Sequence, residues 1–193
     1  MKTLLYCLPV LVLAYHEFKS DFKIPVEEDF PQERQIEHIP KKRMFTSIEP
    51  LQKKMDGELL SLIKRFEGFS HKVYKCSAGV DTIGYGFTNP EIVKKGFLTE
   101  EEASILLEEE VNKHLSYVES LTKKPLTDSQ KIALTSFSFN CGKENLKNII
   151  ARINKGKMEE AANAILLYVR ANGKVLKGLQ KRRNIEYKLF VGA

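Results

Sequence analysis

The spacing of apolar positions changes twice along the chain. An apolar run, TLLYCLPVLVLAY, occupies residues 3–15, and a polar stretch with scattered apolar residues follows it to residue 56. Beyond that point apolar residues recur at helical spacing and stop at Gly68; they are Leu59, Leu60, Leu62, Ile63 and Phe66. A period near 3.6 predicts an amphipathic helix, and a glycine directly after the last periodic residue is typical of a helix end.

The remaining pattern predicts a small sheet followed by helices. Residues 69–89 are rich in glycine, aromatic and β-branched residues, which predicts an antiparallel hairpin or meander. Thr99 and Thr127 each precede a Glu or Gln by three residues, and these capping boxes predict helices to about Leu121 and Asn140. Further helices are expected over residues 143–154, 157–171 and 179–191. The predicted fold class is α+β and mostly α.

Proline and glycine usage divides the chain. Five of the seven prolines precede residue 57, whereas all eleven glycines lie at Gly57 or later. We therefore predict a signal or signal-anchor segment at 1–15, a polar arm or linker at 16–56, and one globular domain at 57–193. Lys2, the apolar run and Ala14 have the form of an export signal. The alternative is an apolar segment that packs on the domain, since an ordinary membrane span needs about 20 residues.

Charge is concentrated in the C-terminal part of the chain. The 31 basic and 25 acidic residues give a net charge of +6. Residues 58–119 carry 7 basic and 11 acidic side chains, and residues 120–193 carry 15 and 5, so this last part attracts anionic partners. No nucleic-acid-reading motif accompanies the charge, and no Cys or His spacing indicates a zinc site. We expect no nucleic-acid partner, no metal and no cofactor.

Candidate chemistry gathers in residues 67–86. Glu67 lies in the last predicted helical turn, where the negative end of the helix dipole raises the pKa of a carboxyl group. A general acid that works near neutral pH needs a shift in that direction. Thr82 opens a TIGYG segment whose Gly84 and Gly86 permit a tight backbone and leave room for a ligand. Taken singly, each feature is more often structural than functional.

Taken together, these residues resemble a known active site. Phe66-Glu67-Gly68, Val73-Tyr74-Lys75-Cys76 and Thr82-Ile83-Gly84-Tyr85-Gly86 are similar to the active-site region of phage-type lysozymes and endolysins. That family has Glu, eight residues, Asp or Cys, five residues and Thr, and Glu67, Cys76 and Thr82 match this spacing. Segments 98–103, 126–142 and 178–190 resemble later family landmarks in the same order. The resemblance covers about residues 57–191.

The resemblance implies a fold and a mechanism. It implies a lysozyme-like two-lobe monomer with a small N-terminal lobe, a long connecting helix near residues 100–120, and a helical C-terminal lobe. The substrate would be bacterial peptidoglycan. Glu67 would protonate the leaving oxygen, while Cys76 and Thr82 would place or activate the attacking water. Asn140, Arg182 and Arg183 would bind substrate, with Asn140 lining the glycan cleft and one of the two arginines also pairing with Glu67.

Several alternatives stay open at this stage. A lytic transglycosylase could use Glu67 alone, and a non-catalytic wall-binding relative would need none of these residues. Because a thiol replaces the usual Asp, the inverting or retaining outcome is undecided. The family includes exported members with a releasable N-terminal anchor, so residues 3–15 could tether the protein to the host inner membrane; without such a signal it would stay in the host cytoplasm. One hypothesis is that Cys7 or Cys141 forms a disulfide with Cys76 that exchange later opens.

Overall fold

The computed structural model describes residues 49–193 except 77–78, 172 and 193. Residues 1–15 and most of the predicted arm at 16–56 lie outside this range. The elements in chain order are α2 (Glu49–Glu67), β1 (Ser70–Lys75), β2 (Asp81–Gly84), α3 (Pro90–Val93), α4 (Glu100–Leu121), α5 (Asp128–Asn154), α6 (Met158–Ile165), β3 (Arg170–Ala171), β4 (Lys174–Val175) and α7 (Lys177–Val191). The predicted α+β, mostly helical class is confirmed, with two small antiparallel sheets.

The N-terminal lobe consists of α2, the β1–β2 sheet, α3 and the first part of α4. In the sheet, Ser70 lies opposite Gly84 and Tyr74 opposite Thr82. Gly84 has a φ of 65°, and a Cβ there would lie 2.9 Å from the Phe87 ring, so the close approach of Phe87 requires glycine. The core of this lobe contains apolar side chains of α2, β2, α4 and the segment before α4, including Leu59, Ile63, Ile83, Leu98, Ala103 and Leu107.

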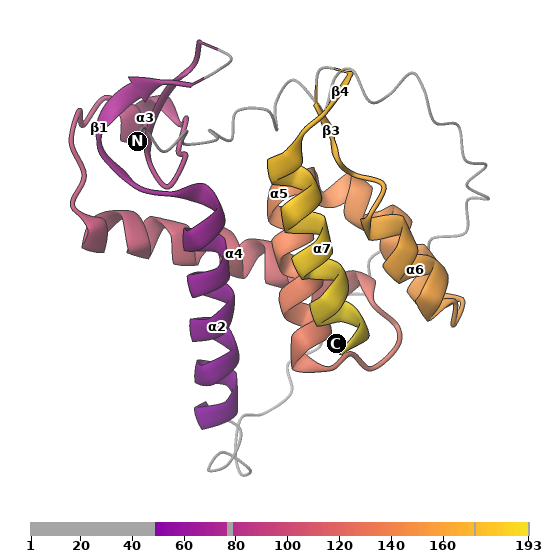
Figure 1. Cartoon of the computed structure of the whole chain (residues 1–193). Coiled ribbons are helices and arrows are strands. Elements are labelled where there is room, and N and C mark those ends of the chain that lie inside the picture. The colour runs from indigo at the N-terminus through magenta and orange to yellow at the C-terminus, as the bar shows by residue number, and fades with distance from the viewer. Residues whose placement is uncertain (1–48, 77–78, 172, 193) are drawn as a thin grey trace.

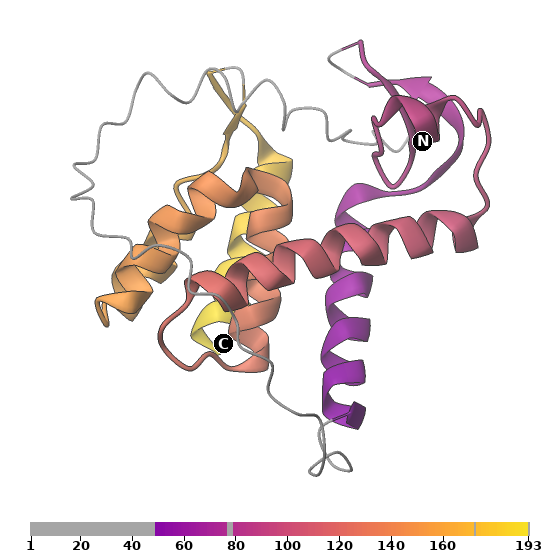
Figure 2. The same ribbon diagram turned by 180° about the vertical axis from the view of Figure 1, so that it is seen from behind.

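Helix α4 connects the two lobes. Figures 1 and 2 show it running from the region of the β1–β2 sheet to the helical part of the molecule. It begins with the predicted capping box, in which the Thr99 side chain accepts from the Glu102 amide and the Glu102 side chain accepts from the Thr99 amide. Leu107 and Val111 pack in the N-terminal core, while Val118 packs in the second core. The predicted long connecting helix is therefore present.

The helical lobe packs α5, α6 and α7 around a second core. Its largest buried members include Phe137, Leu146, Ile149, Ile153 and Ile165. Helix α5 starts at the second predicted capping box, on Thr127, and bends at Gly142, whose φ of 82° and ψ of 165° are not helical. The predicted break between residues 140 and 143 thus corresponds to this bend. Side by side in Figure 1, α5 and α7 bring Ser136 and Arg182 together.

One predicted helix is wrong over its second half. The expected helix over residues 157–171 is α6, which ends at Ile165, and β3 pairs with β4 in a short hairpin after it. Gly173 has a φ of 69° and lies between the two strands. The sequence there is Asn172-Gly173, the dipeptide most typical of two-residue hairpin turns. Within the part of the chain that the structure describes, no helix is long and apolar enough to cross a bilayer.

Candidate active site

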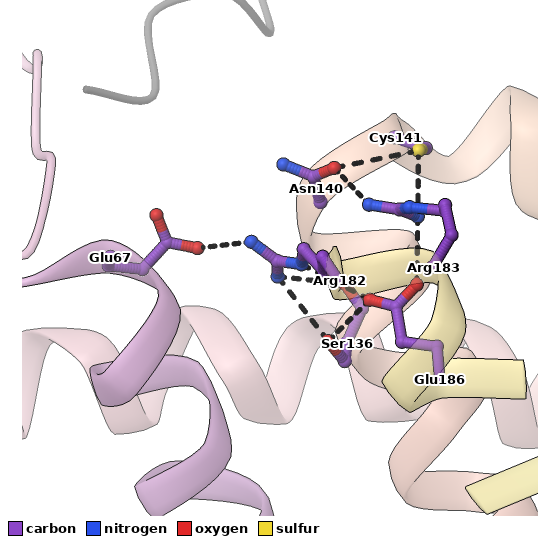
Figure 3. A network of polar contacts seen from close by, with 7 residues as sticks. All are labelled: Glu67, Ser136, Asn140, Cys141, Arg182, Arg183 and Glu186. Atoms are coloured by element: carbon purple, nitrogen blue, oxygen red, sulfur yellow. Dashed lines mark hydrogen bonds and ion pairs between the residues drawn. The ribbon is translucent and has the colours of Figure 1, made fainter. Parts of the chain in front are cut away.

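Glu67 is the last residue of α2, and local backbone geometry fixes where its side chain begins. Gly68 adopts a left-handed φ of 69°, and its amide donates to the Lys64 carbonyl at 3.0 Å. This is the helix-ending arrangement that a glycine favours. The Glu67 side chain is fully buried, with 0% of its surface exposed. It extends from α2 toward α7 of the other lobe (Figure 3).

Arg182 of α7 meets that carboxylate. Its Nη1 donates to Glu67 Oε1 at 2.8 Å. The same guanidinium donates from Nη2 to the Ser136 carbonyl at 3.1 Å and from Nε to Glu186 Oε1 at 3.1 Å. The ring of Phe66 lies 4.6 Å from the Arg182 guanidinium carbon, a distance typical of a cation–π contact. The ion pair predicted for Arg182 or Arg183 is made by Arg182.

A second buried arginine continues the network away from Glu67. Arg183 Nη1 lies 2.9 Å from Glu186 Oε2 and 3.2 Å from the Cys141 sulfur. Arg183 Nη2 donates to Asn140 Oδ1. The Ser136 hydroxyl donates to Glu186 Oε1 at 2.7 Å. Figure 3 shows the resulting chain of contacts from Glu67 on α2 through α7 to the bend of α5.

Burial and charge act on Glu67 in opposite directions. Burial raises the pKa of Glu67 above its ordinary value, because the ionised form loses its hydration, and the positive charge of Arg182 lowers that pKa in part. Glu186 raises the pKa further and Arg183 lowers it. The net pKa is raised, so the protonated carboxyl persists toward neutral pH. This is the balance that the sequence alone left undecided.

The two carboxylate oxygens of Glu67 have different surroundings. Oε1 accepts the hydrogen bond from Arg182, whereas Oε2 is buried and has no hydrogen-bond partner in the described part of the chain. Figure 3 shows Oε2 turned away from Arg182. Because Oε1 already accepts from a permanent cation, a proton on Glu67 resides on Oε2. An acid proton is therefore directed away from the arginine.

Cys76 directly follows β1 and Thr82 lies in β2, and Val80 connects them. The Val80 amide donates to the Cys76 sulfur at 3.3 Å, and the Thr82 hydroxyl donates to the Val80 carbonyl at 3.0 Å. Cys76 is 7% exposed and Thr82 is fully buried. Since the Thr82 hydroxyl proton is already donated, its oxygen is left to accept a hydrogen bond. Cys76 and Cys141 are free thiols, and Cys7 lies outside the described residues.

The structure brings some predicted residues together and adds others. Glu67 contacts Arg182, and Asn140 contacts Arg183, while Cys76 and Thr82 both contact the Val80 backbone in the N-terminal lobe. The sequence reasoning did not assign Glu186 or Ser136 to the site. Glu186 could have been found from its spacing of four and three residues after the two arginines on one helix. Ser136 carries no such signal.

Comparisons with known proteins agree on one family. The family model described as phage lysozyme matches residues 64–186. The endolysin of Bacillus phage B103 is 38% identical over 136 residues, which cover 68% of this chain and 52% of that protein. The chain thus spans about half the length of that relative. A SAR-endolysin of bacteriophage PS119 is 31% identical over 122 residues, covering 62% of this chain and 73% of that protein.

A solved structure shows the same arrangement. The muramidase domain of SpmX from Asticaccaulis excentricus superimposes with a TM-score of 0.62 at 35% sequence identity. The match covers 69% of this chain and 95% of that domain. The range that the family model matches, residues 64–186, contains Glu67, the connecting helix and the two arginines of α7.

Proposed function

This chain belongs to the phage lysozyme family, and we propose that it is an endolysin-type muramidase acting on bacterial peptidoglycan during host lysis. The bond cut is the β-1,4 bond between N-acetylmuramic acid and N-acetylglucosamine. The observation that carries this proposal is the state of Glu67, a buried carboxyl whose Oε1 is held by Arg182 and whose Oε2 has no partner among the described residues. A monomer suffices, since both sides of the proposed site come from one chain.

The proposed reaction uses Glu67 as general acid. Its Oε2 proton passes to the glycosidic oxygen as the bond to the anomeric carbon breaks, and a water oxygen forms the new bond to that carbon. The water gives up a proton, and Glu67 regains one. The raised pKa of Glu67 matters here because a carboxyl group with an ordinary pKa would be ionised at neutral pH. Arg182 keeps the acid oriented and stabilises its ionised form after transfer.

Cys76 and Thr82 have the other role in the proposed reaction. Both are held on the Val80 backbone, and the Thr82 oxygen is free to accept from a water. Their proposed role is to place or activate the attacking water. Asn140, which holds Arg183, is assigned to the glycan cleft, while Arg182 and Arg183 contribute to substrate binding by keeping that side of the site in place.

The decisive experiment replaces the proposed acid. Glu67→Gln keeps the size of the side chain and its contact with Arg182 but has no proton to donate. We expect the rate of release of peptidoglycan fragments to fall at least about 100-fold. Glu58→Gln is the matched control, because Glu58 is an exposed carboxylate on the same helix that lies 4.0 Å from Lys54. If Glu67→Gln clears peptidoglycan as fast as the unchanged protein, the enzymatic proposal fails.

Mass spectrometry of the wild-type products tests the reaction type. Reducing ends on the fragments indicate hydrolysis, whereas 1,6-anhydro ends indicate a lytic transglycosylase.

We also propose that residues 1–15 export or tether the chain at the host inner membrane, with residues 16–56 as a linker and 57–193 as the catalytic domain. The support is the apolar run at 3–15 and the similarity to a SAR-endolysin. The full chain is expected in the membrane pellet after a high-salt wash, and a variant lacking residues 2–15 in the soluble fraction. Recovery of both proteins in the soluble fraction would reject a tether.

A further inference from the structure

The contacts that orient Arg182 depend on Glu186. The planar guanidinium is held along three sides, by Glu67 Oε1 at 2.8 Å, by the Ser136 carbonyl at 3.1 Å and by Glu186 Oε1 at 3.1 Å. A planar guanidinium bonded on several sides cannot rotate without losing contacts. The Ser136 hydroxyl, which donates to the same Glu186 oxygen at 2.7 Å, fixes the position of that carboxylate. Glu186 thus sets the direction in which Arg182 faces Glu67.

Glu186 also determines the charge around Glu67. The cluster contains two arginines and two carboxylates, and Arg183 lies 2.9 Å from Glu186 Oε2. With Glu67 ionised the cluster is neutral, and with Glu67 protonated it carries one positive charge. Without the charge of Glu186, two buried cations would act on Glu67 alone and would strongly favour its ionised form. The Glu186–Arg183 pair is therefore a neutral unit that leaves one cation for Glu67.

We propose that Glu186 is a positioning residue for this reaction, acting through Arg182: it fixes the guanidinium against Glu67 Oε1 and neutralises the second buried arginine. Its two carboxylate oxygens face Arg182, Ser136 and Arg183, so its effect passes through Arg182 and not through contact with the glycan. This inference rests on the proposed function, in which protonated Glu67 is the general acid.

The charged groups that act on Glu67 come from one helix. Its charged neighbours Arg182, Arg183 and Glu186 all belong to α7. Helix α5 contributes the neutral Ser136 and the thiol of Cys141, whose pKa is raised by burial although Arg183 lowers it in part. On the β1–β2 hairpin, exposed Lys75 and Asp81 pair with each other at 2.8 Å.

The test is the pH dependence of kcat/KM on soluble peptidoglycan fragments. The alkaline limb of that profile reports the loss of the acid proton. We expect Glu186→Gln to move this limb to lower pH by about one unit or more, because Glu67 then faces two uncompensated cations. A purely structural role would lower activity by the same factor at every pH and leave the limb in place. That result would overturn the proposal.

A second variant keeps the test decisive if Glu186→Gln folds poorly. Arg183→Met removes the other member of the neutral unit, so the alkaline limb is expected to move in the opposite direction, to higher pH. The double variant Arg183→Met/Glu186→Gln restores the charge of the cluster and is expected to return the limb toward its original position. Ser136→Ala changes no charge and is expected to leave the limb unmoved. Thermal unfolding of each variant establishes that the folded protein is being measured.

The outcomes separate this inference from the proposed function. An active Glu67→Gln protein defeats the function itself. If Glu67→Gln is inactive but the alkaline limb of the pH profile does not move in Arg183→Met or in Glu186→Gln, the proposed function stands. Only the positioning role of Glu186 is then rejected.

Discussion

The two sides of the candidate site are built by different physical means. On the hairpin side, Cys76 and Thr82 are held by hydrogen bonds to the backbone of one residue, Val80, and the ion pair on this hairpin, Lys75 with Asp81, is exposed. On the α7 side, Arg182, Arg183 and Glu186 are buried and paired. The hairpin can thus vary its side chains locally, whereas the α7 side functions only as a set.

Because of this difference, the charges that set the protonation of Glu67 lie in the lobe to which Glu67 does not belong. Glu67 is part of α2, yet the charges that act on it come from α7, 115 residues or more further along the chain. The Glu67–Arg182 ion pair connects the two lobes, and it also affects the pKa of the proposed acid. Breaking either side of the site should therefore give a different kind of defect.

The largest effect is expected from Arg182→Met. This change removes the main cause that lowers the pKa of Glu67, and it leaves a buried carboxylate without its partner. Removing one member of a buried ion pair costs about 3–5 kcal/mol. The folded-state pKa of Glu67 is already raised and would rise further, so stability falls as pH increases from the unfolded-state pKa through the folded-state value. We therefore expect a larger loss of stability at pH 8 than near pH 4.

Urea unfolding at the two pH values measures this difference. Lys181→Met is the matched control, since Lys181 is an exposed cation beside Arg182 in sequence, and we expect it to change stability by less than about 0.5 kcal/mol. A loss in Arg182→Met that is equal at both pH values would show that the Glu67 charge is not what the arginine stabilises.

The same contrast explains what could be predicted from sequence. Features fixed by neighbours along the chain were predictable: the end of α2 at Glu67 before Gly68, the capping boxes at Thr99 and Thr127, and the interruption at Gly142. Each depends on residues within a few positions, whose backbone preferences act locally. The spacing of Glu67, Cys76 and Thr82 was legible because it resembles the pattern of phage-type lysozymes.

Features that depend on distant contacts were not predictable. The choice of Arg182 over Arg183 as the partner of Glu67 depends on how α7 packs against α5 and which of its arginines reaches α2. Ser136 and Glu186 lie 50 residues apart in sequence, and no local pattern joins them. The stretch Ile165 to Val169 is apolar throughout, so its composition did not show that α6 ends at Ile165 and that a short hairpin begins at Arg170.

A smaller and purely local effect is expected on the hairpin side. Cys76→Ala removes the acceptor of the Val80 amide and the proposed contact with the attacking water. We expect kcat/KM to fall about 100-fold, as for the loss of a group that assists proton transfer, with the alkaline limb of the pH profile unmoved because the charges of α7 are intact. Cys76→Asp keeps an acceptor for Val80 and supplies the carboxylate found in the family pattern, so it should retain activity within about tenfold of the unchanged protein.

Lys72→Ala, at an exposed position of β1, is the control for disturbance of the hairpin, and activity within about twofold of the unchanged protein is expected. If Cys76→Ala instead moves the alkaline limb as far as Glu186→Gln does, the hairpin side also sets the protonation of Glu67. The proposed separation of roles between the two sides of the site would then be wrong, because Cys76 would affect the protonation of Glu67 as well as the placement of the water.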